Sequence, residues 1–296
     1  MAWALVAGVA FGVTQTLNRK SNQLIGPFRT AFGLIVVVEV VLLTISVISG
    51  EIGRLAGAPL GALVAFAVAT SFHFGAGWTL LAMSQQRVGV ARTGAVVSAA
   101  PLVGAIAAAL VLDEPLTPFT AGGVVLVVTG VVVISLSTRG RVDPTAGDPP
   151  ASRPGWPWHA LAVAALWGTT PILIRRGLED LPSPILGLTV GLAATVVVYG
   201  IGLTLAGAWD HRIPARAITW TFLGGLTGAL AITTQWISFD LTTIAISLSL
   251  QQTAVLVVVA LAPIMFPEPI ERINRMLLIG TVAILAGTVL VVYPEW

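Results

Sequence analysis

The sequence contains no cysteine among its 296 residues, and only 9% of the residues are charged. Without thiols the chain cannot form a disulfide framework, a thiolate zinc site or a cysteine nucleophile. A soluble domain carries about 25% charged residues, so the low charge excludes an ordinary water-soluble globule. Hydrophobic residues make up 56% of the chain and its mean hydropathy is +0.95. The lipid bilayer is therefore the expected surroundings of most of the chain.

Clustered positive charge and enzyme motifs are also lacking. The net charge is +2, and the 15 lysines and arginines are scattered among short loops, so we expect no nucleic-acid partner. The sequence has no HExxH motif, no P-loop and no paired acidic motif within an apolar segment. We therefore predict no enzymatic activity, no cofactor and no metal site, and we expect the bilayer and a small-molecule substrate as the partners of a monomer or homodimer.

Long apolar segments fill the chain between its charged turns. A hydrocarbon core about 30 Å thick takes roughly 20 helical residues, and cutting at charged and Pro- or Gly-marked turns predicts ten spans. We expect them at residues 2–18, 29–49, 59–83, 90–112, 117–137, 157–175, 183–208, 217–237, 242–265 and 272–294. Residues 138–156 are rich in Pro, Gly, Asp and Arg and too polar to span, which predicts a linker.

The same pattern of residues occurs on both sides of this linker. FGVTQTLNRK (11–20) aligns with WGTTPILIRR (167–176) at an offset of 156. Near the end of each half, a Glu-Pro pair precedes two glycines that are seven residues apart. Self-similarity of this kind indicates an internal repeat. We predict a first five-helix repeat at 1–137 and a second at 157–296.

An odd number of spans in each half places the second half upside down relative to the first. The predicted fold class is thus an all-α integral membrane protein of ten transmembrane helices, arranged as two inverted-topology repeats, as in many secondary transporters. Charges agree, because 12 Lys and Arg fall in loops on one side and three (Arg54, Arg175 and Arg176) on the other. The positive-inside rule makes the charge-rich side cytoplasmic and places both termini outside.

These features resemble the EamA-like branch of the drug/metabolite transporter superfamily. The resemblance lies in two five-helix halves, an aromatic-Gly pair in the first helix of each (Phe11 and Trp167 precede the glycines), and a Glu-Pro turn before a glycine-spaced helix. It implies a multi-pass protein of the cell membrane that exports or exchanges a small metabolite, amino acid or drug-like solute, often coupled to protons. Family members usually keep both termini cytoplasmic, which conflicts with the charge distribution, so the orientation stays open.

Two ionisable residues within predicted spans are candidates for proton coupling. Glu39 lies in the middle of an apolar segment with no cation nearby in sequence, and His73 lies in the middle of the third span. An ionisable group at this depth costs about 2.5 to 3.5 kcal/mol on insertion scales, which favours a functional role. The alternative is structural: a protonated Glu39 bonded to another helix, and His73 as a satisfied core residue.

Neutral polar residues recur at matching places in the two halves, as Thr79 with Thr233 and Ser98 with Gln252, at an offset of 154. Such symmetry favours a cavity between the halves, although hydrogen bonds between helices are the alternative role. The predicted substrate-binding residues are Thr14, Gln15, Thr79, Ser98, Trp167, Thr170, Thr233, Gln235, Trp236, Gln251 and Gln252. Trp78 is a further candidate wall, whereas tryptophans near span ends predict interface anchors: Trp3, Trp156, Trp158, Trp209, Trp220 and Trp296.

Other functions fit parts of the pattern. Flipping of a lipid or polyprenyl carrier is possible on the same fold, and a channel or an intramembrane enzyme fits less well. Basic pairs close the first span of each half, at residues 19–20 and 175–176. We interpret them as snorkelling anchors in preference to an anion-attracting site. The scarcity of charge within the spans favours a neutral, zwitterionic or hydrophobic-cation solute over a phosphorylated sugar.

Overall fold

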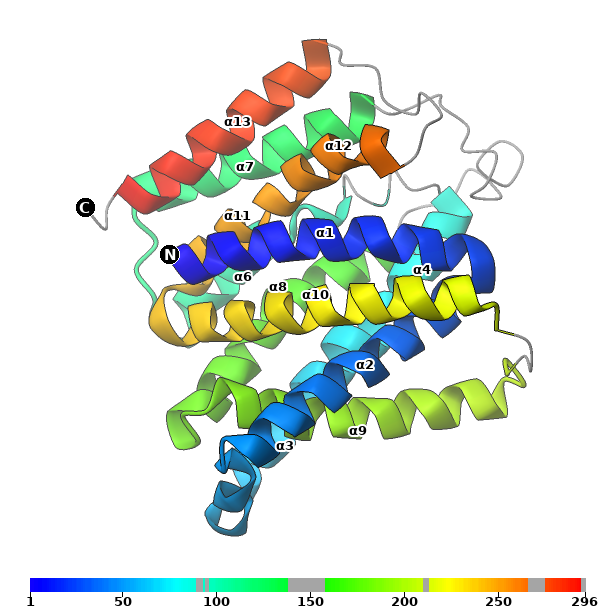
Figure 1. The fold of residues 1–296 in the computed structure, drawn as a ribbon. Helices are drawn as coiled ribbons and strands as arrows, with labels where there is room; N and C mark the ends of the chain where they lie inside the picture. The colour runs from blue at the N-terminus through cyan, green and yellow to red at the C-terminus, as the bar shows by residue number, and fades with distance from the viewer. Residues whose placement is uncertain (89–92, 94–95, 138–157, 210–212, 266–274, 294–296) are drawn as a thin grey trace.

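The computed structural model describes residues 1–88, 93, 96–137, 158–209, 213–265 and 275–293 (Figure 1). This part of the chain contains helices and turns and no strand. Its first half comprises α1 (Ala2–Ile25), α2 (Pro27–Ile48), η1 (Glu51–Gly57), α3 (Leu60–Thr70), η2 (Ser71–Ala76), α4 (Gly77–Val88), α6 (Ala100–Val111) and α7 (Pro118–Ser137). Its second half comprises α8 (Trp158–Asp180), α9 (Pro184–Leu205), α10 (Ala215–Leu241), α11 (Ile244–Gln251), α12 (Thr253–Met265) and α13 (Arg275–Val292). The predicted linker, 138–156, lies outside the described residues, as do Trp156 and Trp296.

Within the part of the chain that the structure describes, four helical segments are long and apolar enough to cross a membrane. They are Pro27–Ile48, Leu60–Leu81, Pro184–Leu205 and Ala215–Leu241. Shorter apolar helices lie beside them at Ala100–Val111, Pro118–Ile134, Ile244–Val258 and Leu278–Val291. Helices α1 and α8 have 24 and 23 residues, which is a spanning length, but both carry basic pairs. An all-helical membrane protein is therefore the observed fold class.

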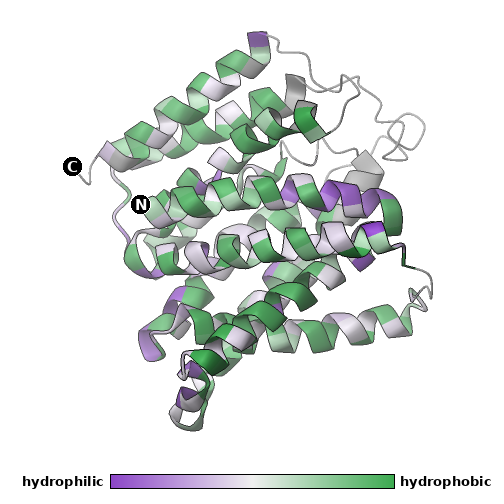
Figure 2. Ribbon diagram, in the orientation of Figure 1, coloured by the Kyte–Doolittle hydropathy of each residue, from purple (hydrophilic) through white to green (hydrophobic). Residues whose placement is uncertain are grey.

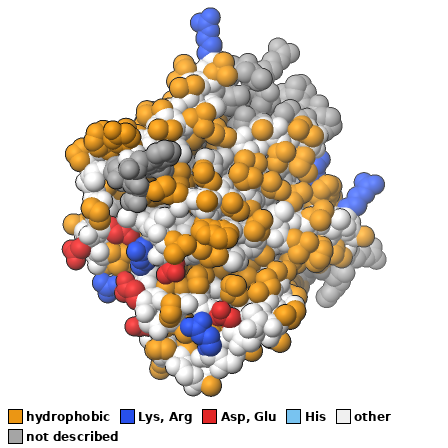
Figure 3. Space-filling model, turned by 60° about the vertical axis from the view of Figure 1, so that its left-hand side comes forward, with side chains coloured by type: hydrophobic (Ala, Val, Ile, Leu, Met, Phe, Trp, Pro, Cys, Tyr) orange, Lys and Arg blue, Asp and Glu red, His pale blue; other side chains and the backbone are white. Residues whose placement is uncertain are grey.

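The outer surface of the bundle is apolar. Leu205 is 84% exposed, Ile48 82% and Leu110 78%. Apolar residues cover the helices along most of their length (Figure 2). The space-filling view shows acidic side chains gathered with several basic ones at its lower left, and further basic side chains at its top and right edge (Figure 3). In contrast, many Ser, Thr and Gln side chains are buried inside. This distribution suits lipid outside and helix-to-helix hydrogen bonds inside.

Several turns meet on the side of the molecule where the chain begins, at the left of Figure 1. We call this side the terminal face. The α6–α7, α8–α9 and α10–α11 turns lie on it, together with η1. Two helices that begin here have side-chain caps: Ser183 accepts the Leu186 N–H before α9, and Thr243 accepts the Ile246 N–H before α11.

Helices α1 and α8 extend farther than the sequence predicted. The expected ends at residues 18 and 175 are too early, because α1 runs to Ile25 and α8 to Asp180. The basic pair of each helix therefore lies within helical structure. Arginine and lysine are good helix formers, so their charge alone does not end a helix. Helix α1 stops at Gly26, whose positive φ of 79° is a conformation that glycine adopts without strain.

Helices from the two halves alternate in the packing. Helix α7 lies along α13, α1 along α10, and α2 along α9, while α8 contacts α3, α4 and α6. The main core lies among these helices and includes Phe66, Trp236 and Phe239, each no more than 1% exposed. The ring of Phe66 on α3 packs on Trp236 of α10, with centroids 5.5 Å apart. The core is thus shared by the two halves.

The α7–α13 pair is held together by glycines. A Cβ built on Gly123 would meet the Gly287 carbonyl oxygen at 2.7 Å, and one built on Gly130 would meet the Gly280 oxygen at 2.6 Å. The same contacts appear from α13, because Gly280 and Gly287 face the carbonyl oxygens of Gly130 and Gly123. Small residues permit this close approach of two backbones. The glycines spaced by seven residues in each half thus lie where α7 and α13 come closest.

Candidate functional site

His73, Thr170 and Trp167 form a polar contact between the two halves. His73 lies in η2, a π-helical turn, and its Nδ1 is 2.8 Å from the hydroxyl of Thr170 on α8. The indole N–H of Trp167, one turn earlier on α8, donates to the His73 carbonyl oxygen at 3.0 Å. The two rings stack with centroids 5.6 Å apart. We call these three residues the His73 cluster.

The π-helical turn explains why this carbonyl needs a partner from another helix. Residues Ser71–Ala76 are wound more loosely than an α-helix, which disturbs the regular hydrogen bonds along the chain. Gly77, directly after the turn, leaves room for the indole: a Cβ there would meet Trp167 Nε1 at 2.5 Å. Such turns are frequent at functional sites. The local sequence thus places an imidazole and an indole side by side in the interior.

A matching contact joins α1 to α10. The hydroxyl of Thr14 lies 2.9 Å from that of Thr227. Thr14 corresponds to Thr170 at the offset of 156, and Thr227 corresponds to His73 at the offset of 154 found for the third span. Equivalent positions of the two halves therefore make the same cross-helix hydrogen bond. One half uses two hydroxyls, and the other uses an imidazole and a hydroxyl.

Glycine contacts repeat in the same way. A Cβ on Gly12 would meet the Ala254 carbonyl oxygen at 2.7 Å and Val257 Cβ at 2.5 Å. A Cβ on Gly168 would meet the Ala100 carbonyl oxygen and Val103 Cβ, each at 2.8 Å. These neighbours also differ in number by 154, while the two glycines differ by 156. The first helix of each half thus packs on the fourth helical segment of the other half by one shared geometry.

A second polar group lies between α10 and α11. The side-chain amide of Gln235 donates to Gln251 Oε1 at 2.7 Å, and Gln235 is 2% exposed. The Oε1 atom of Gln235 is buried and has no hydrogen-bond partner among the described residues. An unpaired buried amide oxygen costs free energy, so this atom is available to a donor from a solute or water. Thr233 is partly buried on the same helix.

Ser98 and Gln252 lie where helices are interrupted. Helix α11 ends at Gln251 and α12 begins at Thr253, with Gln252 between them. Ser98 lies in the corresponding turn just before α6, and it is 3% exposed. Interrupted helices expose backbone groups inside a membrane protein and are common at transporter binding sites. The two residues that the offset paired thus occupy equivalent breaks.

The remaining predicted residues lie in different surroundings. Thr79 donates to the Gly75 carbonyl oxygen at 2.7 Å, within its own helical segment. Trp236 is 1% exposed and packs in the main core on Phe66, where its role is packing. Gln15 is exposed on the outer side of α1. The structure thus groups His73 with Trp167 and Thr170, and Gln235 with Gln251, and leaves these three outside both groups.

Glu39 lies in the middle of α2, which packs against α9 and α10. The residue is partly buried, and its Oε2 atom is fully buried without a hydrogen-bond partner among the described residues. A buried carboxyl oxygen without a partner is costly. The helix-to-helix hydrogen bond of the structural alternative is absent from the described residues for this atom. His73 bonds to Thr170, and no hydrogen bond joins it to Glu39 in the described part of the chain.

Sequence reasoning missed a charged network on the terminal face. Arg175, interpreted from sequence as a snorkelling anchor, pairs with Glu114 at 3.5 Å and donates to two carbonyl oxygens of the α10–α11 region. Glu114 was treated only as the marker of a turn. The repeated Glu-Pro turn and the repeated basic pair were the available signals, because they recur together in both halves. Among the described residues no group of three His, Asp or Glu could hold a metal ion.

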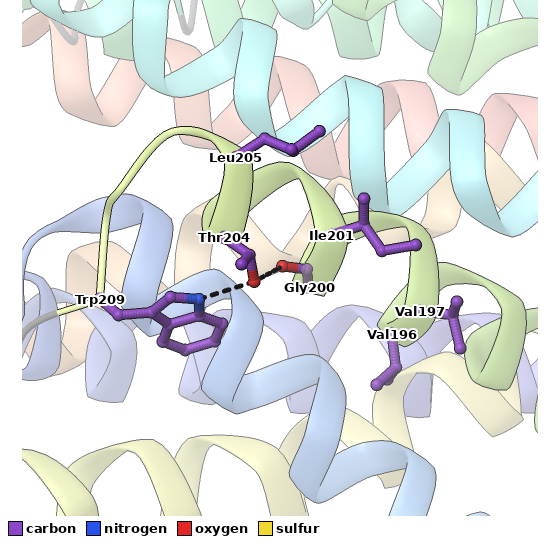
Figure 4. Close-up of a pocket in the computed structure, with 7 residues that line it drawn as sticks. All are labelled: Val196, Val197, Gly200, Ile201, Thr204, Leu205 and Trp209. Atoms are coloured by element: carbon purple, nitrogen blue, oxygen red, sulfur yellow. Dashed lines mark hydrogen bonds between the residues drawn. The ribbon is translucent and has the colours of Figure 1, made fainter.

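A pocket lies on the outer side of α9, and we call it the outer groove (Figure 4). Its volume is about 430 Å³, and seven residues line it: Val196, Val197, Gly200, Ile201, Thr204, Leu205 and Trp209. The Trp209 indole N–H donates to the Thr204 hydroxyl at 2.9 Å, so the polar groups there are satisfied by each other. Trp3, Trp158 and Trp209 are 44%, 52% and 45% exposed, in keeping with interface positions. The groove is a lipid-facing surface and not the predicted site.

Comparison with known proteins finds a family model that matches the first half of the chain. Residues 1–136 match the model of the EamA-like transporter family, which is part of the drug/metabolite transporter superfamily. The match runs nearly to the end of α7. The resemblance inferred from the sequence is confirmed. No curated protein matches the chain.

A solved structure resembles this fold over nearly the whole chain. A crystal structure of a protein matches the fold with a TM-score of 0.75. The match covers 99% of this chain and 97% of that one. The sequence identity is 17%, so the likeness concerns the fold. The family match over residues 1–136 and the apolar helices together suggest a multi-pass membrane protein, and the match points toward a transporter of the drug/metabolite type.

Proposed function

We propose that the protein is a secondary active transporter that exports or exchanges a small metabolite, amino acid or drug-like solute across the cell membrane. In this proposal, residues 1–137 and 157–296 are two inverted five-helix repeats, giving ten transmembrane helices. The solute binds between the halves, near the His73 cluster and the Gln235–Gln251 pair. The family match over residues 1–136 supports transport, and the remaining steps rest on the contacts described above.

The duplicated hydrogen bond is the observation that carries this proposal. Thr14–Thr227 and Thr170–His73 occupy equivalent positions and make equivalent contacts. Chance would not reproduce this bond together with the glycine contacts and the helix breaks. In secondary transporters with inverted repeats, the repeat interface is where solutes bind and where one half rocks against the other. The duplication therefore supports alternating access about the interface.

The chemistry of the interior supports a solute with little net charge. Among the described residues, the buried polar groups are hydroxyls, amides and the imidazoles of His73 and His159, Glu39 is partly buried, and the basic pairs lie toward helix ends. A phosphorylated solute needs charge-assisted partners such as arginine. The stacked rings of His73 and Trp167 suit an apolar or cationic group, since an aromatic face attracts cations. We propose a neutral, zwitterionic or hydrophobic-cation solute, with Glu39 as the proton-binding group.

The first test is flux into liposomes that contain the purified protein. Lumenal pH, followed with a trapped dye, is measured while amino acids, sugars, nucleosides, sugar phosphates and lipophilic cations are added in turn. Transport of one of the uncharged, zwitterionic or cationic classes is the expected result. Preferential exchange of sugar phosphates would contradict the proposed solute class. Redistribution of fluorescent lipid without movement of any soluble compound would favour the lipid-carrier alternative.

Thr170→Val should weaken transport of the solute found in this panel. The change keeps the shape of the side chain and removes the partner of His73 Nδ1, so the imidazole loses its fixed orientation. A hydrogen bond of this kind contributes about 0.5 to 1.5 kcal/mol, which predicts an uptake rate roughly two- to tenfold lower. Thr169→Val is the matched control, because that exposed hydroxyl bonds only within its own helix, to Ala165. Equal uptake by the two variants would remove His73 from the site.

A further inference from the structure

Glu114 and Arg175 join the two halves on the terminal face, away from the interior polar groups. Arg175 Nη1 donates to the carbonyl oxygens of Phe239 and Thr242, at 2.7 Å each, and lies 3.5 Å from Glu114 Oε1. The other carboxylate oxygen, Oε2, accepts the Ile244 backbone N–H at 2.8 Å. One acidic side chain and one basic side chain thus engage both sides of the α10–α11 turn.

The two charges complement the helices that they touch. The last carbonyl groups of α10 lack partners within their helix, and a guanidinium supplies donors to them. The first N–H groups of α11 likewise need acceptors, and the Glu114 carboxylate supplies one. A cation at a helix C-terminus and an anion at a helix N-terminus are each also favoured by the helix dipole. Each charge in the network is therefore stabilised by backbone groups at a helix end, in addition to the opposite charge.

Burial distinguishes this pair from ordinary surface charges. The side chain of Glu114 is 11% exposed and that of Arg175 is 28% exposed. Burial raises the pKa of the Glu114 carboxyl above its ordinary value, and the Ile244 N–H and the Arg175 charge reduce this increase. The neighbouring Arg176 is exposed and, as far as the described residues go, donates only to the Val111 carbonyl oxygen, at 3.3 Å. Of the two arginines, one is thus built into the structure and the other resembles an anchor.

Glu114 is the residue through which this network joins the two halves of the chain. Arg175 is held by carbonyl groups of its own half of the chain, and Ile244 also belongs to that half. Glu114 comes from the other half, on the turn between α6 and α7, where Asp113 takes a positive φ of 53°. Separation of the halves on this face breaks the two bonds of Glu114 and leaves Arg175 with its carbonyl partners. Glu114 is the movable member and Arg175 is the fixed one.

We propose that Glu114 and Arg175 form a latch that closes the terminal face in this structure and releases when the halves separate there during transport. The inference rests on the proposed function, because alternating access requires that one face open while the other is closed. The latch is formed by a carboxylate with two partners, so removing its charge weakens the closed state without removing the interior binding groups.

The test measures the opening of this face directly. Since the chain has no cysteine, spin labels can be attached at single cysteines introduced at Leu116, on the α6–α7 turn, and at Glu179, near the end of α8; both sites are exposed. Distances between the labels are measured by pulsed electron resonance in liposomes without solute. The labelled protein without further substitutions should show mainly one short distance between the two labels. Glu114→Gln and Arg175→Gln should raise the longer-distance population about tenfold or more, as expected for loss of hydrogen bonds to charged groups.

Asp113→Asn is the matched control, since it removes one negative charge from the adjacent exposed residue and asparagine tolerates positive φ. It should leave the distances unchanged. Distributions for Glu114→Gln that coincide with those of the control would overturn the latch. Should Glu114→Gln fail to fold, Glu114→Asp keeps the charge but shortens its reach, and unchanged distances in that variant would overturn it equally. Because no solute is present, the distance measurement does not depend on the outcome of the transport assay.

Discussion

Liposomes that contain the Glu39→Gln protein should lose solute-dependent proton movement and fall to the rate of protein-free liposomes. The substitution keeps the size of the side chain and removes its ability to release a proton. Glu39 lies in the middle of α2 with a buried carboxyl oxygen that has no partner among the described residues. An ionisable group kept at this depth despite its cost is typical of a proton relay. Lumenal pH and uptake of the same solute are measured together.

Glu179→Gln provides the control for this experiment. It also removes one carboxylate, but from an exposed residue near the end of α8, and should leave proton movement unchanged. Glu39→Asp, which keeps an ionisable group, should retain part of the activity. Solute uptake that is equal in wild type and Glu39→Gln, without any pH response in either, would leave transport standing and remove proton coupling.

Gly123→Ala should lower the thermal stability of the purified protein more than any conservative change at a surface glycine. The added methyl group would lie 2.7 Å from the Gly287 carbonyl oxygen and from the Val291 backbone nitrogen. Because both atoms belong to the backbone, no side-chain rotation relieves the clash, and α7 must move away from α13. Overpacking of this kind costs about 1 to 3 kcal/mol. The midpoint of thermal unfolding in detergent is the measurement.

Gly122→Ala is the neighbouring control. A methyl group there would meet only Leu290 Cδ2, at an ordinary contact distance of 3.5 Å. Both substitutions gain helix propensity, about 1 kcal/mol for alanine over glycine, so the difference between the two variants isolates the clash. Gly130→Ala should repeat the effect at the second contact, about 10 Å along the helix. A Gly123→Ala protein as stable as the Gly122→Ala protein would contradict the close packing.

Much of the fold could be predicted from the sequence because lipid restricts the available structures. Buried backbone groups in a bilayer are satisfied within helices, so apolar length alone located most of the helical segments. Charge misled the assignment of helix ends, since Arg19 and Arg175 lie inside helices that continue beyond them. The π-helical turn was not predictable, because nothing in the residues Ser71–Ala76 distinguishes it from an α-helix.

The sequence was less informative about the site. The repeat offset singled out Thr170, and composition singled out His73, but their hydrogen bond joins residues 97 positions apart and required the packing of η2 on α8. The same limit applies to Glu114 and Arg175, whose partners include backbone groups that no sequence pattern names. Trp236 shows the opposite failure, since a residue chosen for its aromatic ring lies in the main core. Which residues remain the solute-binding set stays a prediction.

The difference between His73 and its counterpart Thr227 has a consequence for the response of the molecule to acid. Two hydroxyls exchange the roles of donor and acceptor freely, and neither changes charge in the physiological range. An imidazole that gains a proton becomes a donor at both nitrogens and carries a charge. Protonation would therefore alter the contact with Thr170 and leave the contact between Thr14 and Thr227 as it was. The two corresponding contacts thus differ in chemistry, because one contains a group that can gain a charge and the other contains none.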